Sequence, residues 1–285
     1  FNLAILRYTG AMPQISKSLN PVTNGTAIQR ANTYTFKTPD YMVASAQAYH
    51  PGTFGDQQHV WNATLSRDVS LFVTHPAAPL SAEGALSVSP GYWVGNGRIP
   101  HVVQDRNVVI NLFDLPVEPG FMEKSVQDFT HAHFPQERFD EVLIDGTYAF
   151  GRTGTTYAAL VTHNPMHYTE GMNDDLVQPG RQVFWVFEAG SESVDGSFED
   201  FMARIRSNPV RYGSGRISYE SGGRVLELSY QGDFSIDGEV RDLQYPRFDS
   251  PYVKAPRKPG VIRIEHEGKS LLLDFYGLKR TVDGV

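Results

Sequence analysis

Short runs in which apolar and polar residues alternate recur along the whole chain. β-Branched and aromatic residues dominate these runs, as in strands that bury one face. The 26 glycines and 18 prolines separate the runs and leave little room for long helices. The pattern predicts fourteen strands, at 31–38, 42–48, 59–65, 69–74, 107–115, 141–144, 147–152, 156–162, 182–189, 216–219, 224–230, 233–236, 261–266 and 269–275.

Tight turns join several of these runs. Asp145-Gly146 and Glu267-Gly268 each separate two predicted strands, and Ser221-Gly222-Gly223 does the same. Glycine at such corners supplies the positive φ that short hairpin turns need. We therefore expect neighbouring strands to pair in antiparallel hairpins.

One segment, 196–205, has helical spacing. Ser197 is in position to cap it, and its apolar residues repeat on one face as Phe198, Phe201, Met202 and Ile205. Many short strands with one inserted helix predict an all-β sandwich of two large antiparallel sheets.

The domain organisation follows from composition along the chain. We place the main sandwich at 1–210 and read 211–285 as terminal hairpins that pack on it or form a small β subdomain. The composition changes near 209–215, and the proline-rich, basic stretch 249–259 has the character of a linker into the last hairpin.

The overall composition excludes several classes of protein. The chain has 285 residues, a net charge of -7 and no cysteine. No run approaches the ~18 consecutive apolar residues of a transmembrane helix. The acidic surplus argues against a nucleic-acid partner. Without cysteine there are no disulfides, thiolate zinc sites or cysteine nucleophiles.

The chain begins at Phe1 rather than at Met, so we expect a processed product or a piece of a longer protein. Two glycosylation sequons, at Asn24 and Asn62, permit an extracellular location. We expect a secreted or cell-surface protein.

Candidate chemistry is densest at 39–101, which holds two of the three tryptophans. Flat aromatic rings stack on sugar rings, and amide and imidazole groups bind hydroxyls or a carboxylate. The sequence therefore indicates a sugar site, with these substrate-binding candidates: Trp61, Trp93, Asn96 and His101.

His59 and His75 each lie at the end of a predicted strand, where a side chain can reach a groove, and they are our catalytic candidates. Trp61 alternates with His59 on the predicted strand 59–65, so the two side chains share a face. The alternative is a pair of hydrogen-bonded structural histidines beside a core tryptophan.

His131 and His133 have the period-two spacing that places two imidazoles on one face of a strand. With a third ligand such a pair binds a metal, although an exposed loop is the alternative. The sequence does not identify a cofactor, and a structural zinc or calcium ion is the candidate. The general base is also left open, and the chain lacks the signatures of phosphate loops, dinucleotide sites, zincins and nucleophile elbows.

Several short segments between residues 30 and 205 occur in an order that can be compared with a known family. They are Pro39-Asp40-Tyr41-Met42, Gln58-His59-Val60-Trp61, Val73-Thr74-His75-Pro76, Gly91-Tyr92-Trp93, Phe134-Pro135, Ala149-Phe150-Gly151-Arg152, Trp185-Val186-Phe187-Glu188 and Gly196-Ser197-Phe198-Glu199. This order resembles the C-terminal part of heparinase II/III-like polysaccharide lyases.

The resemblance implies a large antiparallel β-supersandwich, galactose-mutarotase-like, that normally accompanies a helical α/α toroid. Such enzymes cleave uronic-acid polysaccharides by β-elimination in a cleft between the two parts. The sandwich lends a histidine in some members, by position His59 or His75 here, and holds a structural zinc in others. The implied partners are an acidic polysaccharide and a toroid, as a domain or chain of the same precursor, because this chain contains none.

Other functions remain open. The chain could instead be a non-catalytic carbohydrate-binding or structural β-sandwich, or an accessory domain of a glycoside hydrolase. A lyase would lose turnover but keep binding when a catalytic histidine is replaced, whereas a binding module has no turnover to lose.

Overall fold

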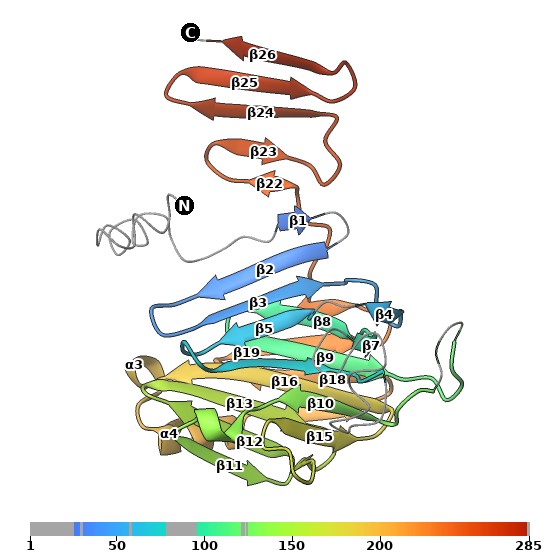
Figure 1. Cartoon of the computed structure of the whole chain (residues 1–285). Coiled ribbons are helices and arrows are strands. Elements are labelled where there is room, and N and C mark those ends of the chain that lie inside the picture. The colour runs from blue at the N-terminus through green and yellow to red at the C-terminus, as the bar shows by residue number, and fades with distance from the viewer. Residues whose placement is uncertain are drawn as a thin grey trace.

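The computed structural model describes residues 26–28, 31–56, 59–77, 96–120, 123 and 125–283. Its first layer is an antiparallel eight-stranded sheet with the order β1-β2-β3-β5-β6-β10-β15-β14 (Figure 1). The later strand β10 pairs with β6, and β15 pairs with β10, which brings residues near 70, 130 and 175 together. The strands are β1 (Thr26–Ile28), β2 (Ala31–Lys37), β3 (Met42–Gln47), β5 (Trp61–Thr64), β6 (Ser70–Thr74), β10 (Phe129–His133), β15 (Asp175–Pro179) and β14 (His167–Tyr168).

The second layer is an antiparallel six-stranded sheet with the order β11-β12-β13-β16-β9-β8. Its strands are β8 (His101–Asp105), β9 (Val108–Asp114), β11 (Glu141–Asp145), β12 (Tyr148–Thr153), β13 (Thr156–Thr162) and β16 (Gln182–Ser191). Every residue of β13 is buried, because both faces of this sheet are covered.

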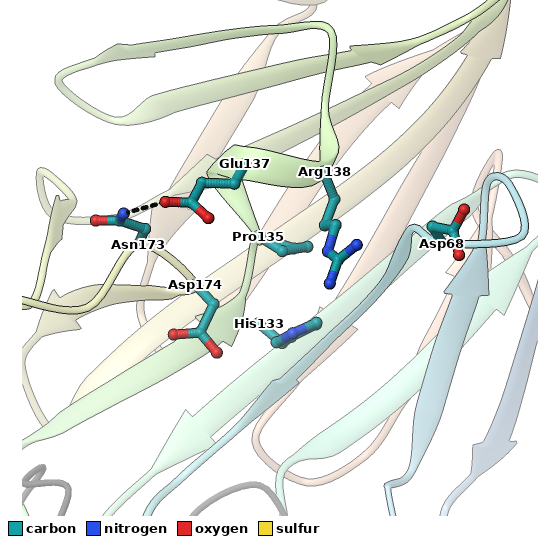
Figure 2. A pocket seen from close by; sticks show the side chains of 7 residues that line it. All are labelled: Asp68, His133, Pro135, Glu137, Arg138, Asn173 and Asp174. Carbon is teal, nitrogen blue, oxygen red and sulfur yellow. Dashed lines mark hydrogen bonds between the residues drawn. The ribbon is translucent and has the colours of Figure 1, made fainter.

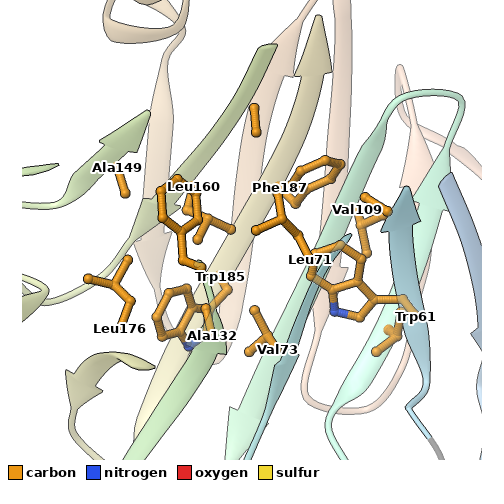
Figure 3. Close-up of a cluster of buried hydrophobic side chains, with 14 of the residues drawn as sticks. Trp61, Leu71, Val73, Val109, Ala132, Ala149, Leu160, Leu176, Trp185 and Phe187 are labelled. Carbon is orange, nitrogen blue, oxygen red and sulfur yellow. The ribbon is translucent and has the colours of Figure 1, made fainter. Parts of the chain in front are cut away.

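The facing sides of these two sheets enclose the main hydrophobic core (Figure 3). Trp61 of β5 and Trp185 of β16 are buried there. The Trp61 ring lies 5.1 Å from the ring of Phe187, and the Trp185 indole donates a hydrogen bond of 2.7 Å to Thr130 Oγ1. Large aromatic rings from both sheets thus fill the space between them.

A second core lies on the other face of the six-stranded sheet. It is covered by helix α4 (Phe198–Ser207), which follows the short helix α3 (Glu192–Asp195), and by a five-stranded sheet. Ser197 caps α4 by accepting a hydrogen bond from the Asp200 amide. The strands of this third layer are β17 (Val210–Gly213), β18 (Arg216–Ser221), β19 (Arg224–Ser229), β20 (Phe234–Ile236) and β21 (Glu239–Val240).

A buried carboxylate fixes the third layer to the middle sheet. Glu188 of β16 accepts hydrogen bonds from Arg204 of α4 at 2.6 Å, from Tyr219 of β18 at 2.7 Å and from Ser221 at 2.8 Å. These partners compensate the cost of burying the charge.

The last five strands form a separate sheet that projects beyond β1 in Figure 1. Asn32 of β2 connects it to the sandwich, because its side-chain oxygen accepts from the Tyr245 amide and from the Arg257 guanidinium. The strands β4 (Phe54–Asp56) and β7 (Asn96–Arg98) pair with each other in a separate two-stranded sheet. The projecting strands are β22 (Phe248–Asp249), β23 (Val253–Ala255), β24 (Val261–His266), β25 (Lys269–Asp274) and β26 (Lys279–Asp283).

The structure confirms the all-β fold class. Each of the fourteen predicted strands is present within a few residues, and the predicted helix is α4. The boundary near residue 210 stays a prediction: β17–β20 share a core with the six-stranded sheet, whereas β22–β26 do not. No helix in the part of the chain described here is long and apolar enough to cross a membrane.

Candidate functional site

The face of the eight-stranded sheet that points away from the core carries the polar chemistry. On β6, Leu71 and Val73 point into the core, so Phe72 and Thr74 point outward. On β10, Ala132 points inward, and His131 and His133 point outward. Because β6 and β10 are paired, these outward side chains lie side by side.

Three rings form a stack on this outer face. The His59 ring lies 3.8 Å from the Phe72 ring at 19°, and the Phe72 ring lies 5.0 Å from the His133 ring at 10°. His59 is exposed, whereas His133 is partly buried. The stack therefore runs across β6 from an exposed end to a sheltered end.

A pocket of about 360 Å³ lies at the sheltered end, beside His133 (Figure 2). It is bounded by the end of β10, by the 3-10 turn Gln136–Arg138 and by the segment before β15. Glu137 accepts a hydrogen bond of 2.8 Å from Asn173 across one side. The lining residues are Asp68, His133, Pro135, Glu137, Arg138, Asn173 and Asp174.

Among the described residues that line the pocket, Arg138 is the only cationic side chain apart from a protonated His133, and it is exposed. No carboxylate of the described segments lies within ion-pair distance of its guanidinium. By contrast, Arg152 pairs with Asp140 and Glu141, and Arg204 pairs with Glu188 and Asp195. An unpaired guanidinium in a pocket is available to an anionic ligand.

His133 is held as a neutral imidazole. Burial lowers its pKa, and its Nδ1 lies 2.9 Å from the Ser70 carbonyl oxygen, to which it donates. In a neutral ring with the proton on Nδ1, the lone pair belongs to Nε2. His133 therefore has the protonation state that a general base requires.

His131, the other member of the predicted metal pair, is completely buried. Its Nδ1 lies 2.8 Å from Asp175 Oδ1, and its Nε2 lies 2.7 Å from Thr74 Oγ1. Asp175 also accepts a hydrogen bond of 2.6 Å from Thr169. Both ring nitrogens of His131 are thus engaged, and the described residues contain no cluster of three metal-ligating side chains. The geometry does not support a metal at His131 and His133.

His75 is buried as well and does not line the pocket. Burial lowers its pKa to about 4, and its Nε2 donates to the Gln127 carbonyl at 3.1 Å. Gly97 packs against the ring so closely that a Cβ there would lie 2.9 Å from Nδ1. His75 has no route to a substrate in this arrangement, so it is a structural histidine rather than the catalytic one predicted.

Trp61 does not share a face with His59 as predicted. The strand β5 begins at Trp61, and His59 lies before it, so the alternation of a single strand does not apply to the pair. Trp61 is 2% exposed in the core, which leaves it no surface for stacking on a sugar.

The remaining predicted residues are dispersed. His101 begins β8 on the six-stranded sheet and does not line the pocket, and burial lowers its pKa. Asn62 of β5 is partly buried on the outer face and accepts a hydrogen bond from Thr64. Trp93, Asn24 and the side chain of Asn96 lie outside the described residues.

Sequence reasoning missed most of the pocket. Phe72 looks like any core residue of β6, and Arg138 lies in a short polar turn with no motif of its own. The signal that was available is the register of β10. If His131 and His133 are placed on a strand, His133 stands at the end of that strand. The turn that follows, Gln136–Arg138, then lies next to His133 and lines the pocket with it.

A comparison of the chain with protein-family models, curated proteins and solved structures finds no match. The fold and the site by themselves define the class of the protein, which is an all-β sandwich with a polar pocket on one outer sheet face.

Proposed function

We propose that the pocket beside His133 binds an acidic sugar, and that this chain forms one wall of the substrate cleft of a polysaccharide lyase. The observation that carries the proposal is Arg138, which has no carboxylate partner among the described residues, beside a neutral His133 at the end of a stack of rings. The resemblance of residues 30–205 to heparinase II/III-like lyases points the same way.

β-Elimination makes three demands on a site. The carboxylate of the uronate must be neutralised, the proton on C5 must be removed, and the bond from C4 to the glycosidic oxygen must break as that oxygen gains a proton. Arg138 suits the first demand, because a guanidinium binds a carboxylate through two parallel hydrogen bonds. The Nε2 atom of His133 suits the second. The electron pair left by C5 forms the double bond to C4, and the proton that His133 Nε2 takes from C5 passes to the leaving oxygen, so no oxidant or water is consumed.

The remaining pocket groups suit sugar hydroxyls. Asp68, Glu137 and Asp174 accept hydrogen bonds, and the amide of Asn173 can accept and donate. The exposed His59 ring, which stacks on the buried Phe72, offers a flat surface to the C–H face of a neighbouring sugar. Three carboxylates against one guanidinium favour a ligand with a single charge at Arg138 rather than a densely charged one.

The second candidate function is non-catalytic carbohydrate binding. It is favoured by the shallow surface formed by the exposed His59 and its ring stack, which needs no base. Binding by such a surface would persist when His133 is changed to a residue that cannot accept a proton.

The test measures binding and turnover on the full chain. Uronate oligosaccharides are titrated by calorimetry, and β-elimination is followed by the ultraviolet absorbance of the unsaturated product. We expect Arg138→Ala to weaken binding about tenfold or more and Arg138→Lys to restore part of it. Arg280→Ala, an exposed arginine of β26, is the matched control.

The His133→Gln variant separates the two functions. A lyase should lose turnover while keeping most of its affinity, whereas a binding module should show no turnover in any variant. If Arg138→Ala binds uronates as tightly as the unaltered chain does, or if the unaltered chain binds none of them, the proposal fails.

A further inference from the structure

A second cavity, of about 420 Å³, lies on the projecting sheet. Its walls come from the segment before β22, from the loop between β23 and β24 and from the end of β25. The lining residues are Arg247, Arg257, Lys258, Pro259, Ile262 and Phe275. Three of these six carry a positive charge and none carries a negative one.

This concentration of positive charge is unusual for the chain, whose net charge is -7. The neighbouring acid, Asp274, is turned away into its own loop, where it accepts hydrogen bonds from the amides of Tyr276 and Gly277. Arg257 is held in place by its hydrogen bond to Asn32 of β2. Lys258 is exposed and, within the described chain, has no carboxylate at ion-pair distance. The cavity therefore holds a local positive potential on an acidic protein.

The cavity also has an apolar side. Phe275 is 52% exposed, although a large aromatic ring usually gains by burial. Pro259 and the buried Ile262 continue this apolar side. A ligand that fits both sides has an anionic group for the cations and a C–H face for the ring.

We propose that this cavity is a second binding site, and that it takes a sugar residue that carries a carboxylate or a sulfate group. The anionic group contacts Arg247 and Lys258, and the sugar ring stacks on Phe275. The site belongs to a different sheet from the pocket beside His133, so it does not depend on the function proposed for that pocket. A chain with both sites would hold an acidic polysaccharide at two points and gain avidity.

A nucleic acid fits the cavity less well. Phosphates follow one another closely along a polynucleotide. Their negative charges would be repelled by the acidic chain around the cavity as well as attracted by its three cations. In a polysaccharide a sugar ring separates successive charges, so one residue can enter the cavity without bringing a dense array of charge with it.

The test uses the full chain with Arg138→Ala as background, so that the pocket beside His133 no longer contributes. The probes are a uronate oligosaccharide, a sulfated oligosaccharide, a neutral oligosaccharide of the same length and inorganic sulfate, each titrated by calorimetry. We expect the charged oligosaccharides to bind and the neutral one to bind at least tenfold more weakly.

Lys258→Ala and Phe275→Ala should each weaken binding of the charged oligosaccharides roughly three- to tenfold. Lys279→Ala, which removes the same charge from β26 outside the cavity, should leave binding unchanged. Circular dichroism and thermal unfolding of each variant show that the fold is kept.

The inference is overturned if Lys258→Ala and Phe275→Ala bind as the background does, or if inorganic sulfate alone binds as tightly as the oligosaccharides. Tighter binding of a single-stranded oligonucleotide than of either charged oligosaccharide would also overturn it. A complete loss of binding of both charged oligosaccharides in the Arg138→Ala background would overturn it as well. Unchanged binding on Arg138→Ala would instead contradict only the proposal for the pocket beside His133, so the two proposals fail separately.

Discussion

The two faces of the eight-stranded sheet are built from the same strands and have opposite characters. The inner face presents Trp61, Leu71 and Val73 to the core, where they are almost completely buried. The outer face presents Phe72 and His133, which form a stack of rings beside a polar pocket. A shift of one residue along a strand changes a packing residue into a candidate ligand-binding residue. Substitutions on the inner face should therefore change stability, and substitutions of exposed side chains in the outer-face pocket should change binding.

The largest effect on stability is expected for Trp61→Ala on the inner face. Removing the indole from a position that is 2% exposed leaves a cavity beside Phe187, and the free energy of unfolding should fall by about 3–5 kcal/mol. Urea unfolding followed by circular dichroism measures the loss. The neighbouring Asn62→Ala, on the outer face, should cost less than about 1 kcal/mol. Equal losses in the two variants would contradict the assignment of the faces.

The buried His75 should make stability depend on pH. The folded pKa of about 4 lies below the ordinary value of 6.5, so the unfolded state binds more protons between these values. The free energy of unfolding should therefore be highest above about pH 6.5 and fall as the pH drops towards 4, by up to about 3 kcal/mol.

The measurement for His75 is urea unfolding at several pH values, on the unaltered chain and on His75→Gln. Glutamine keeps a donor for the Gln127 carbonyl but does not titrate, so the difference between the two chains should change across this window. A constant difference from pH 7 to pH 4 would show that the His75 ring is not buried as described.

A smaller effect is expected for Thr74→Val, which tests the buried part of the outer face. The change keeps the side-chain volume but removes the hydroxyl 2.7 Å from His131 Nε2. An unsatisfied buried nitrogen should lower the free energy of unfolding by about 1–3 kcal/mol. Thr64→Val is the matched control, because Thr64 is only partly buried. An unchanged midpoint for Thr74→Val would mean that the contact with His131 adds nothing to stability.

The smallest effect on stability is expected for Arg138→Ala. Its side chain is exposed and unpaired in the described chain, so the free energy of unfolding should change by less than about 0.5 kcal/mol. The same change should have the largest effect on uronate binding. If it instead destabilises the chain as much as Thr74→Val does, Arg138 supports the fold rather than a ligand.

The sequence predicts the fold well because strand alternation and hairpin turns are local signals. The glycine corners near 146, 222 and 268 locate three hairpins, and Ser197 locates the start of α4. The strands that were missed have weak local signals. β10 reads Phe-Thr-His-Ala-His and β15 ends in proline. β10 becomes a strand by pairing with β6 and with β15, and both pairings join segments far apart in the sequence.

The site was harder to predict because it depends on those long-range pairings. Trp61 and His75 have residue types suited to chemistry, yet they are buried by elements that come from elsewhere in the sequence. Conversely, His59 is brought onto Phe72 by the packing of neighbouring strands and not by spacing. A side chain's residue type can be read locally, but whether it faces a core or a pocket is decided by the partner strand.

The link from Asn32 to the segment before β22 has a consequence for biosynthesis. Asn32 bonds to Tyr245, 213 residues later, and Gln47 bonds to the same tyrosine. At about 5–20 residues per second, a ribosome needs roughly 10–40 s to make the intervening chain. For that time the side chains of Asn32 on β2 and Gln47 on β3 lack their hydrogen-bond partner. This part of the protein can close only after Tyr245 has been translated, and until then these buried polar side chains lack the partner that the folded chain provides.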